Sequence, residues 1–385
     1  MASDASAKAP GKILWLGGYS VLERPNISFV SAVDAYVTAD LKIRTDQEVD
    51  INAPQLNLSS KGKVDKSTGK ISMNVQKELL LLKTAAEISS RYIAGLGHQI
   101  SGFSITTKSD DAFAYSLSAG KVVKSGLGSS AAVTVATVGA VLKAFGINPS
   151  ENDTLHKLAQ AAHSIATGKV GSGFDIAAAS FGSILYTRYS PEIVKDLPAN
   201  YTNAQLLDLA RMKWDYKIEK FSLPNEFRLL FANFEDSMIT TKAIGSVSDF
   251  KKNDPHTYGD IIGEINEENI KAISALRDMK NGISENALEK FRAAFDRGRI
   301  ITKKLGLFSN VGIEPDDCTA LIEDSIKNGA FVAKLPGAGG KDAISALSIN
   351  QISQKALYRF WKSKKELRVL KISFTSNGAN DFAPG

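Results

Sequence analysis

The sequence predicts an α+β fold that is divided into two domains. The chain has 385 residues, whereas a single hydrophobic core stops growing at roughly 250 to 300 residues. Short apolar runs bounded by turn residues, which predict strands, come in small groups rather than in strict alternation with helices. That order argues against a doubly wound parallel sheet. Glycine-rich loops follow predicted strands in both halves of the chain.

Strands are predicted where apolar residues alternate or cluster, and helices where they recur every three to four residues. The predicted strands are residues 13–16, 29–33, 36–43, 103–107, 183–186, 228–234, 331–335 and 369–374. The predicted helices are residues 75–92, 131–145, 155–166, 266–280, 285–305 and 315–328. A polar, proline-bearing segment predicts a loose connection at residues 191–224. The expected domains are therefore residues 1–190 and 225–385.

The composition is that of an ordinary globular protein, with 43% hydrophobic and 23% charged residues. The net charge of +6 is modest, and the basic cluster between Arg359 and Lys371 predicts a solvated face, not a nucleic-acid stripe. The uncharged run between Lys124 and Lys143 begins with too many glycines and serines to predict a membrane span. Cys318 is the single cysteine, so no disulfide forms within the chain and a cytoplasmic location is expected.

Residues 124–132 have the sequence KSGLGSSAA, which predicts a phosphate-binding loop. Small residues allow the backbone to approach a ligand closely. A helix is predicted to begin directly afterwards, and its free N–H groups and positive dipole end attract anions. The hydroxyls of Ser129 and Ser130 could reach a phosphate or a magnesium ion, and Lys124 adds a positive charge. The alternative is a tight turn that caps a helix of small residues.

Two rival phosphate motifs fit this loop poorly. The Walker pattern requires Gly-Lys-Ser/Thr after a glycine and four residues, and no segment has it. The relaxed dinucleotide pattern is met by Gly126, Gly128 and Ala131. It also requires a βαβ unit whose second strand ends in an acidic residue, and Glu151 and Asp153 lie instead in a polar turn.

Three other stretches are candidates for the same site. In residues 9–19, APGKILWLGGY, Lys12 stands at the start of a predicted apolar strand, where lysine is unusual. In residues 168–175, GKVGSGFD, Asp175 follows a glycine turn and precedes an apolar segment. In residues 334–342, KLPGAGGKD, glycines follow a strand and precede a predicted helix. The first two have a structural alternative by themselves, a β-turn with an edge lysine and an aspartate that caps a helix. The third is a weak signal when it is read alone.

Taken together, the four stretches resemble the motif set of the GHMP kinases, a family that includes galactokinase, homoserine kinase, mevalonate kinase and phosphomevalonate kinase. The order of the motifs matches, and their joint occurrence is far more specific than any single loop. Finer segments resemble the phosphomevalonate kinase branch: residues 17–23, 32–35, 124–130, 156–160, 162–163, 168–179, 214–217 and 223–224. The resemblance spans most of residues 7–348 and is weak in residues 44–74 and 250–315.

The resemblance implies an N-terminal domain of the ribosomal-S5 type, a C-terminal ferredoxin-like domain, and ATP and Mg²⁺ as cofactors. It implies an ATP-binding loop formed by Gly126, Leu127, Gly128, Ser129, Ser130 and Ala131, with Ser130 as a magnesium ligand. It implies an acceptor site between the domains formed by Lys12, Tyr19, Ser172, Gly337, Ala338 and Gly339. The implied catalytic residues are Lys12, Lys124 and Asp175.

The implied chemistry is transfer of a phosphoryl group from ATP to phosphomevalonate, which needs positioning and charge neutralisation. A phosphate acceptor already carries negative charge at neutral pH, so a strong base is less necessary than cations. We therefore expect Lys12 and Lys124 to contribute more to the rate than Asp175. Many GHMP kinases place a magnesium-binding glutamate where this chain has His163 and Ser164, so the metal is expected to rest on Ser130, the ATP phosphates and water.

Several alternatives stay open at this point. The chain could be another GHMP kinase that acts on an alcohol, such as a mevalonate kinase, or a related ATP-dependent decarboxylase, because Lys12 and Asp175 suit either chemistry. A non-catalytic sensor with the same fold is expected to have lost Asp175 or Ser130, and both are present. The expected partners are small molecules only, without nucleic acid or membrane, and the expected state is a monomer or homodimer.

Overall fold

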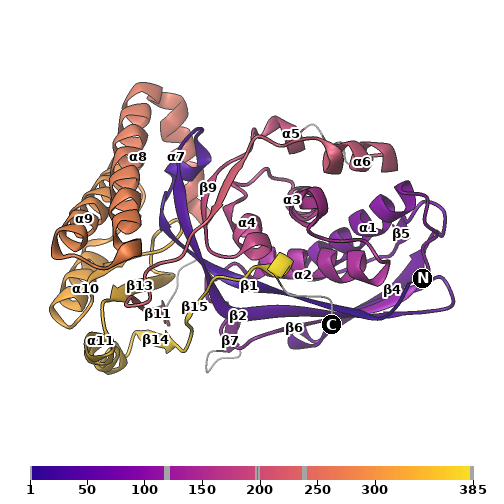
Figure 1. The fold of residues 1–385 in the computed structure, drawn as a ribbon, viewed down its shortest axis with the longest axis horizontal. Helices are drawn as coiled ribbons and strands as arrows, with labels where there is room; N and C mark the ends of the chain where they lie inside the picture. Colours follow the sequence, from indigo (N-terminus) through magenta and orange to yellow (C-terminus); the bar gives the residue numbers. More distant parts are fainter. Residues whose placement is uncertain (1, 117–121, 196, 198–199, 236–240, 382–385) are drawn as a thin grey trace.

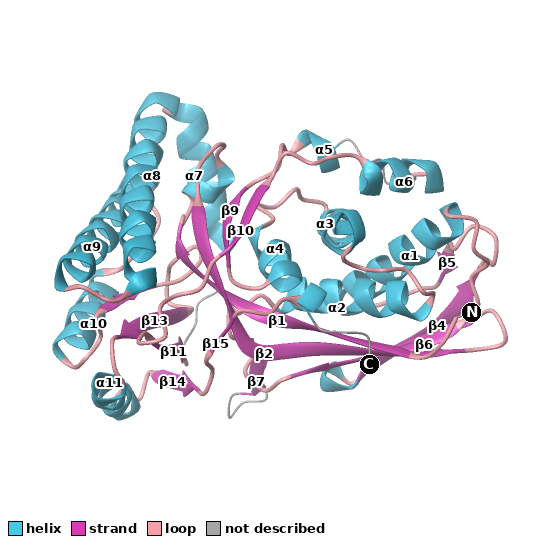
Figure 2. Cartoon of the chain, in the orientation of Figure 1, coloured by secondary structure: helices cyan, strands magenta, loops and turns pink. Residues whose placement is uncertain are grey.

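The computed structural model describes residues 2–116, 122–195, 197, 200–235 and 241–381. The side chains of residues 114–116, 122–124, 152, 241–245 and 281 also lie outside that description. The chain forms a long first sheet with helices packed on one face, beside a second half that contains a smaller sheet and a group of helices (Figures 1 and 2). The predicted α+β class is confirmed.

The first sheet is built around β2, a strand of 16 residues. The order is β10-β9-β2-β6-β3-β4-β5, and β1 and β15 also pair with β2. Its alternating sequences, such as the EVDINA of β3, bury every second side chain. The strands are β1 (Ala5–Leu16), β2 (Ser28–Ile43), β3 (Glu48–Ala53), β4 (Leu58–Val64), β5 (Ile71–Ser72), β6 (Phe103–Ser109), β9 (Ile184–Thr187), β10 (Lys217–Lys220) and β15 (Phe374–Thr375).

One edge of β2 is shared by three strands that are far apart in sequence. Residues Ser28 to Val30 pair with β9, and residues Val37 to Ile43 pair with β6. The gap between them is filled by β15, whose Phe374 and Thr375 pair with Val33 and Ala32. The end of the chain thus returns to the first sheet, as Figure 1 shows.

The helices α1 (Leu80–Gly95), α2 (Ser129–Ala144), α3 (Thr154–Thr167) and α4 (Phe174–Phe181) lie on one face of this sheet, with α5 (Glu192–Lys195) and α6 (Asn203–Arg211) beyond them (Figure 2). The β-branched residues of α2 lower its intrinsic helix propensity. Nearly all of its side chains are buried, so packing favours the helix. Gly139 allows the close approach to β1, since a Cβ there would lie 3.1 Å from the Cβ of Ala7.

The second sheet is antiparallel, in the order β12-β13-β11-β14. Its strands are β11 (Arg228–Phe234), β12 (Val332–Lys334), β13 (Ala343–Ser348) and β14 (Leu367–Leu370). The helices of this half are α7 (Thr241–Asn253), α8 (Pro255–Asp278), α9 (Glu285–Phe308), α10 (Asp316–Lys327) and α11 (Gln351–Ser363). One hydrophobic cluster joins both halves, since it includes Trp15 and Phe29 together with Phe231 and Phe291. A short hairpin, β7 (Ala114–Ser116) with β8 (Val122–Lys124), leads to α2.

Helices α1, α2, α3, α9 and α10 are found within a few residues of where they were predicted. Helix α8 begins at Pro255 and not at residue 266, and α7 and α11 were not predicted. Three further local predictions are wrong. Residues 191–224 are not an irregular connection, because they contain α5, α6 and β10, and β10 pairs with β9 of the first sheet. Residues 343–348 form strand β13 and not a helix. Lys12 lies well inside β1 and not at its start. The division of the chain into domains at residues 190 and 224 stays a prediction.

Candidate active site

The loop at residues 125–130 lies between β8 and the first turn of α2. Gly126 and Gly128 have φ angles of +74° and +83°, which favour glycine. Leu127 is buried and anchors the loop, whereas Ser129 and Ser130 are partly exposed at the helix N-terminus. The first N–H groups of a helix lack partners within the helix, so this end of α2 is suited to an anion.

Lys12 of β1 lies directly against this loop. Its Nζ donates to the carbonyl of Gly126 at 2.9 Å, and its backbone N–H donates to the carbonyl of Leu127 at 2.9 Å. A Cβ on Gly128 would lie 2.8 Å from Cε of Lys12, so the lysine stem needs glycine at that position. The ring centroid of Phe174 lies 5.6 Å from Nζ.

The charge of Lys12 is coupled to Asp175. Burial lowers the pKa of the Lys12 ammonium below its usual 10.5, and the Asp175 carboxylate partly offsets that effect. The burial effect is the larger of the two because a buried charge loses its hydration. An anionic ligand at this position would add negative charge and favour the ammonium form.

Asp175 lies in the first turn of α4, after a turn that needs glycine. Gly173 has a φ of +79°, and a Cβ there would lie 2.7 Å from both the hydroxyl of Tyr186 and a ring carbon of Tyr189. The Tyr186 hydroxyl donates to the carbonyl of Ser172 at 3.0 Å. Tyr186 and Tyr189 therefore pack against this turn and leave room only for glycine at position 173.

Arg188 connects the Asp175 turn to the segment after Tyr19. Its guanidinium donates to the carbonyl of Gly171 at 2.8 Å and to the carbonyl of Leu22 at 2.8 Å. The side chain is almost fully buried. These contacts fix the glycine turn of residues 168–173 relative to the short 3-10 helix of residues 20–22, which follows β1.

Tyr19 connects the first half to the glycine-rich loop of the second half. Its hydroxyl donates to the carbonyl of Ala338 at 2.8 Å, and burial raises its pKa to about 12. Its φ of +58° is unusual for a residue other than glycine. A Cβ on Gly18 would lie 3.7 Å from the carbonyl of Gly337, so the two loops are in close contact.

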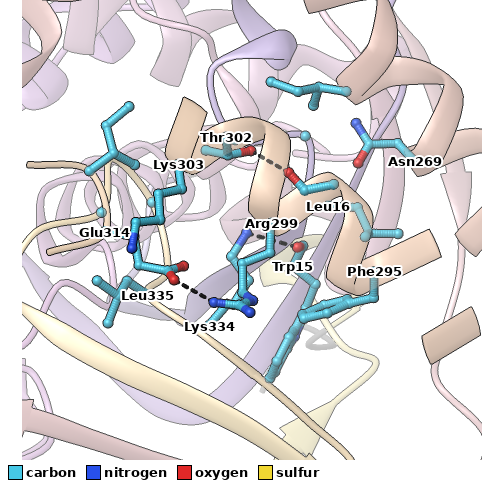
Figure 3. Close-up of a pocket in the computed structure, with 17 residues that line it drawn as sticks. Trp15, Leu16, Asn269, Phe295, Arg299, Thr302, Lys303, Glu314, Lys334 and Leu335 are labelled. Carbon is cyan, nitrogen blue, oxygen red and sulfur yellow. Dashed lines mark hydrogen bonds and ion pairs between the residues drawn. The ribbon is translucent and has the colours of Figure 1, made fainter. Parts of the chain in front are cut away.

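A small cavity that contains several charged side chains lies between these two loops and the helices α8 and α9. Figure 3 shows Lys334, Arg299 and Glu314 pointing toward one another inside it. Lys334 donates to the carbonyl of Trp15 at 3.0 Å, and burial lowers its pKa to about 8. Arg299 pairs with Glu314. The hydrogen bond from Lys334 to Trp15 therefore links the second half of the chain to the end of β1.

The structure brings most of the predicted residues into neighbouring loops. Lys12 contacts the loop of Gly126, Leu127 and Gly128, and its charge is coupled to Asp175. Tyr19 contacts Ala338. The side chain of Lys124 lies outside the described residues. The roles assigned to the predicted residues stay predictions, Ser172, Gly337 and Gly339 included.

Asn233 and Arg188 are among the residues of this region that were not predicted from the sequence. Asn233 and Arg188 both hold the backbone of a glycine-rich loop. The only signal for Asn233 is an asparagine within the apolar strand RLLFANF. Arg188 follows an apolar strand without any motif of its own.

No cluster of three or more histidine, cysteine, aspartate or glutamate side chains suited to a metal ion occurs in the part of the chain that the structure describes. Among the same residues, no helix has both the length and the apolar character needed to span a membrane.

Comparison with known proteins relates this chain to a family of kinases. Residues 80–183 match the family model of the GHMP kinase N-terminal domain. A phosphomevalonate kinase of Saccharolobus solfataricus is 30% identical over 88% of either chain. The peroxisomal phosphomevalonate kinase of Arabidopsis thaliana is 28% identical and covers 94% of this chain and 93% of its own length. The matched N-terminal domain and these relatives thus define a kinase of the GHMP class.

A solved structure supports the same fold over nearly the whole chain. Phosphomevalonate kinase of Streptococcus pneumoniae, in complex with phosphomevalonate and AMPPNP, superposes with a TM-score of 0.75. It is 20% identical and covers 96% of this chain and 99% of its own. Within the GHMP kinases, the chain belongs to the phosphomevalonate kinase family.

Proposed function

We propose that this enzyme transfers the γ-phosphoryl group of ATP to the phosphate of (R)-5-phosphomevalonate and forms 5-diphosphomevalonate. The observation that carries the proposal is the position of Lys12. Its ammonium group binds a carbonyl of the nucleotide loop and is coupled to Asp175. A cation at that point neutralises both polyanions as they approach.

The reaction needs few groups because phosphoryl transfer depends mainly on positioning and charge stabilisation. An oxygen of the acceptor phosphate attacks the γ-phosphorus, the bond from the γ-phosphorus to its bridging oxygen breaks, and ADP leaves with that electron pair. Lys12 and Lys124 stabilise the charge of the transferring group. Asp175 orients the acceptor and accepts the proton of an acceptor phosphate that is still protonated.

The remaining ligand contacts are assigned by position. Gly126 to Ala131 hold the ATP phosphates through backbone N–H groups and the serine hydroxyls. Lys12, Tyr19, Ser172 and residues Gly337 to Gly339 surround the acceptor. The contact of Tyr19 with Ala338 supports this assignment, because it holds the two acceptor loops together.

Magnesium fits the donor set of this site. Ser130 is partly exposed at the N-terminus of α2, and hydroxyl and phosphate oxygens are ligands that Mg²⁺ prefers. Ser130 would hold the ion together with the ATP phosphates and water. The ion would supply positive charge to the phosphate oxygens.

Cytoplasmic location and a monomeric or homodimeric state stay predictions. The Arabidopsis relative is named peroxisomal. A cytoplasmic location of this chain would therefore differ from the location of that relative. An import experiment with the tagged full chain distinguishes the two.

We expect turnover with ATP and (R)-5-phosphomevalonate to exceed turnover with mevalonate, homoserine or galactose by at least about a hundredfold. The reason is that a site rich in cations loses much of its transition-state binding when the acceptor lacks a phosphate. A coupled ADP-release assay measures this, and mass spectrometry of the product should show one added phosphoryl group. Faster turnover of an alcohol, or loss of carbon dioxide, would refute the proposal.

Replacing Asp175 with asparagine should lower kcat less than loss of the Lys12 charge does, and it should also shift the pH profile. The Asp175 carboxylate raises the pKa of Lys12 against the effect of burial. Without that carboxylate the pKa of Lys12 falls further, so the ammonium is lost at a lower pH. The alkaline limb of kcat/KM for the acceptor should therefore move to lower pH.

The control for this experiment is Asp208→Asn, which removes an exposed carboxylate of α6. It should leave both kcat and the profile unchanged. An alkaline limb of Asp175→Asn that coincides with the wild type would show that the Lys12 charge does not control the rate.

A further inference from the structure

Asn233 is a fully buried asparagine in β11, one of the two inner strands of the second sheet. A buried amide is costly unless its polar atoms are hydrogen-bonded. Its Nδ2 donates to the carbonyl of Ser125 at 3.0 Å and to the carbonyl of Asp342 at 3.2 Å. One side chain of the second half thus contacts both glycine-rich loops, since Ser125 precedes Gly126 and Asp342 follows Gly340.

The two carbonyls also determine the orientation of the amide. Only the NH₂ group of asparagine can donate to them, so its oxygen cannot take the position of its nitrogen. Oδ1 has no hydrogen-bond partner in the described part of the chain. The side chain is therefore held in place by the two hydrogen bonds that its NH₂ group donates.

Asn233 is one of three donors that bind successive carbonyls of the nucleotide loop. The carbonyl of Ser125 accepts from Asn233, that of Gly126 accepts from Nζ of Lys12, and that of Leu127 accepts from the backbone N–H of Lys12. In a trans peptide the C=O and the following N–H point in opposite directions. When these carbonyls face the protein, the N–H groups of residues 126–128 face away from it.

Those N–H groups are available to a ligand. For the amides of residues 126–128, the structure records no hydrogen-bond partner among the residues it describes. Successive N–H groups that point to one side form an anion-binding concavity. The donor group of Asn233 thus helps to set the orientation on which phosphate binding by this loop depends.

We propose that Asn233 is a positioning residue of the nucleotide loop, which it holds from the second half of the chain through the carbonyl of Ser125. By its second hydrogen bond, to Asp342, it also fixes the distance between the nucleotide loop and the acceptor loop. The inference rests on the proposed function, because it takes ATP phosphate as the ligand of residues 126–130.

The test is direct binding of ADP to the full chain, measured by calorimetry without any acceptor. Asn233→Ala should weaken ADP binding by at least about tenfold and raise KM for ATP in proportion, with a smaller change in KM for the acceptor. The matched control is Gln354→Ala, since Gln354 Nε2 also donates to a neighbouring strand carbonyl, that of Leu229 at 2.7 Å. It lies away from both loops, so ADP binding should stay within twofold of the wild type.

A second variant keeps the test decisive if Asn233→Ala is poorly folded. Asn233→Asp keeps the side-chain volume but replaces the donor group with a carboxylate. Its ADP affinity relative to the wild type should be low at pH 8 and should recover at pH 6, because a buried carboxyl protonates readily and can then donate. That recovery is not expected of a residue that only fills space.

The outcomes separate the two proposals. Folded Asn233→Ala, or Asn233→Asp at pH 8, that binds ADP within twofold of the wild type would overturn the role of Asn233 and leave the proposed function intact. A wild-type chain that binds no ADP would overturn both. Selective loss of ADP affinity in the two variants, with Gln354→Ala unchanged, supports the inference.

Discussion

Replacing Lys12 with methionine lowers kcat by more than about tenfold, which corresponds to about 1.4 kcal/mol of transition-state stabilisation. Methionine keeps much of the stem that packs against Gly128 but removes the ammonium group. The carbonyl of Gly126 then loses its donor, and the charge that neutralises two phosphates is absent. Steady-state kinetics with ATP and (R)-5-phosphomevalonate measures this effect.

The control is Lys8→Met on the same strand, four residues earlier. Nζ of Lys8 lies 4.7 Å from the ring centroid of Tyr36, away from the glycine-rich loops. Its kcat should be that of the wild type. If Lys12→Met retains more than a tenth of the wild-type kcat, the central role given to Lys12 is wrong.

Gly173→Ala should be a highly damaging small substitution in the site. The new Cβ would lie 2.7 Å from the Tyr186 hydroxyl and 3.1 Å from Oε1 of Gln160, at a φ of +79°. Overpacking costs about 1 to 3 kcal/mol, and the left-handed conformation adds about 1 to 2 kcal/mol. We expect the free energy of unfolding to fall by about 2 to 5 kcal/mol on these two principles. The Asp175 turn must also shift, so kcat should fall by more than about tenfold.

Gly168→Ala provides the matched comparison at the other end of the same loop. Gly168 has a φ of +66°, and a Cβ there would meet nothing within 4 Å. Gly168→Ala should therefore lower the free energy of unfolding only by the cost of the left-handed backbone conformation, about 1 to 2 kcal/mol. Chemical denaturation of both variants measures the difference. Equal destabilisation by the two substitutions would mean that the tyrosines do not hold the turn.

The sequence allowed prediction of the loops because each depends on local chemistry. Gly126 and Gly128 need positive φ angles, and Gly173 needs space beside two tyrosines. Because only glycine meets these requirements, glycines mark the loops in the sequence. The apolar pattern of a helix follows each of these loops directly, so the loops can be recognised. The electrostatic coupling of Lys12 to Asp175 links residues 163 positions apart, and only the order of the family motifs indicated it.

The features that sequence analysis missed depend on contacts between distant segments. Lys334 binds the carbonyl of Trp15, and Asn233 binds that of Ser125, and neither partner has a side-chain signature. The segment after Gly340 was predicted as a helix, because a glycine loop can precede either element. It is a strand because its residues Ala343 to Ser348 are all buried between β12 and β11.

The late arrival of β15 has a consequence for biosynthesis. Ala32 and Val33 are made early, but their partners, Phe374 and Thr375, are made only after the other strands of both sheets. At about 5 to 20 residues per second, the nascent chain keeps this short edge unpaired for on the order of ten seconds after β9 has been made. Unpaired strand edges invite association with other chains, and this enzyme completes its first sheet only after its second sheet has been made.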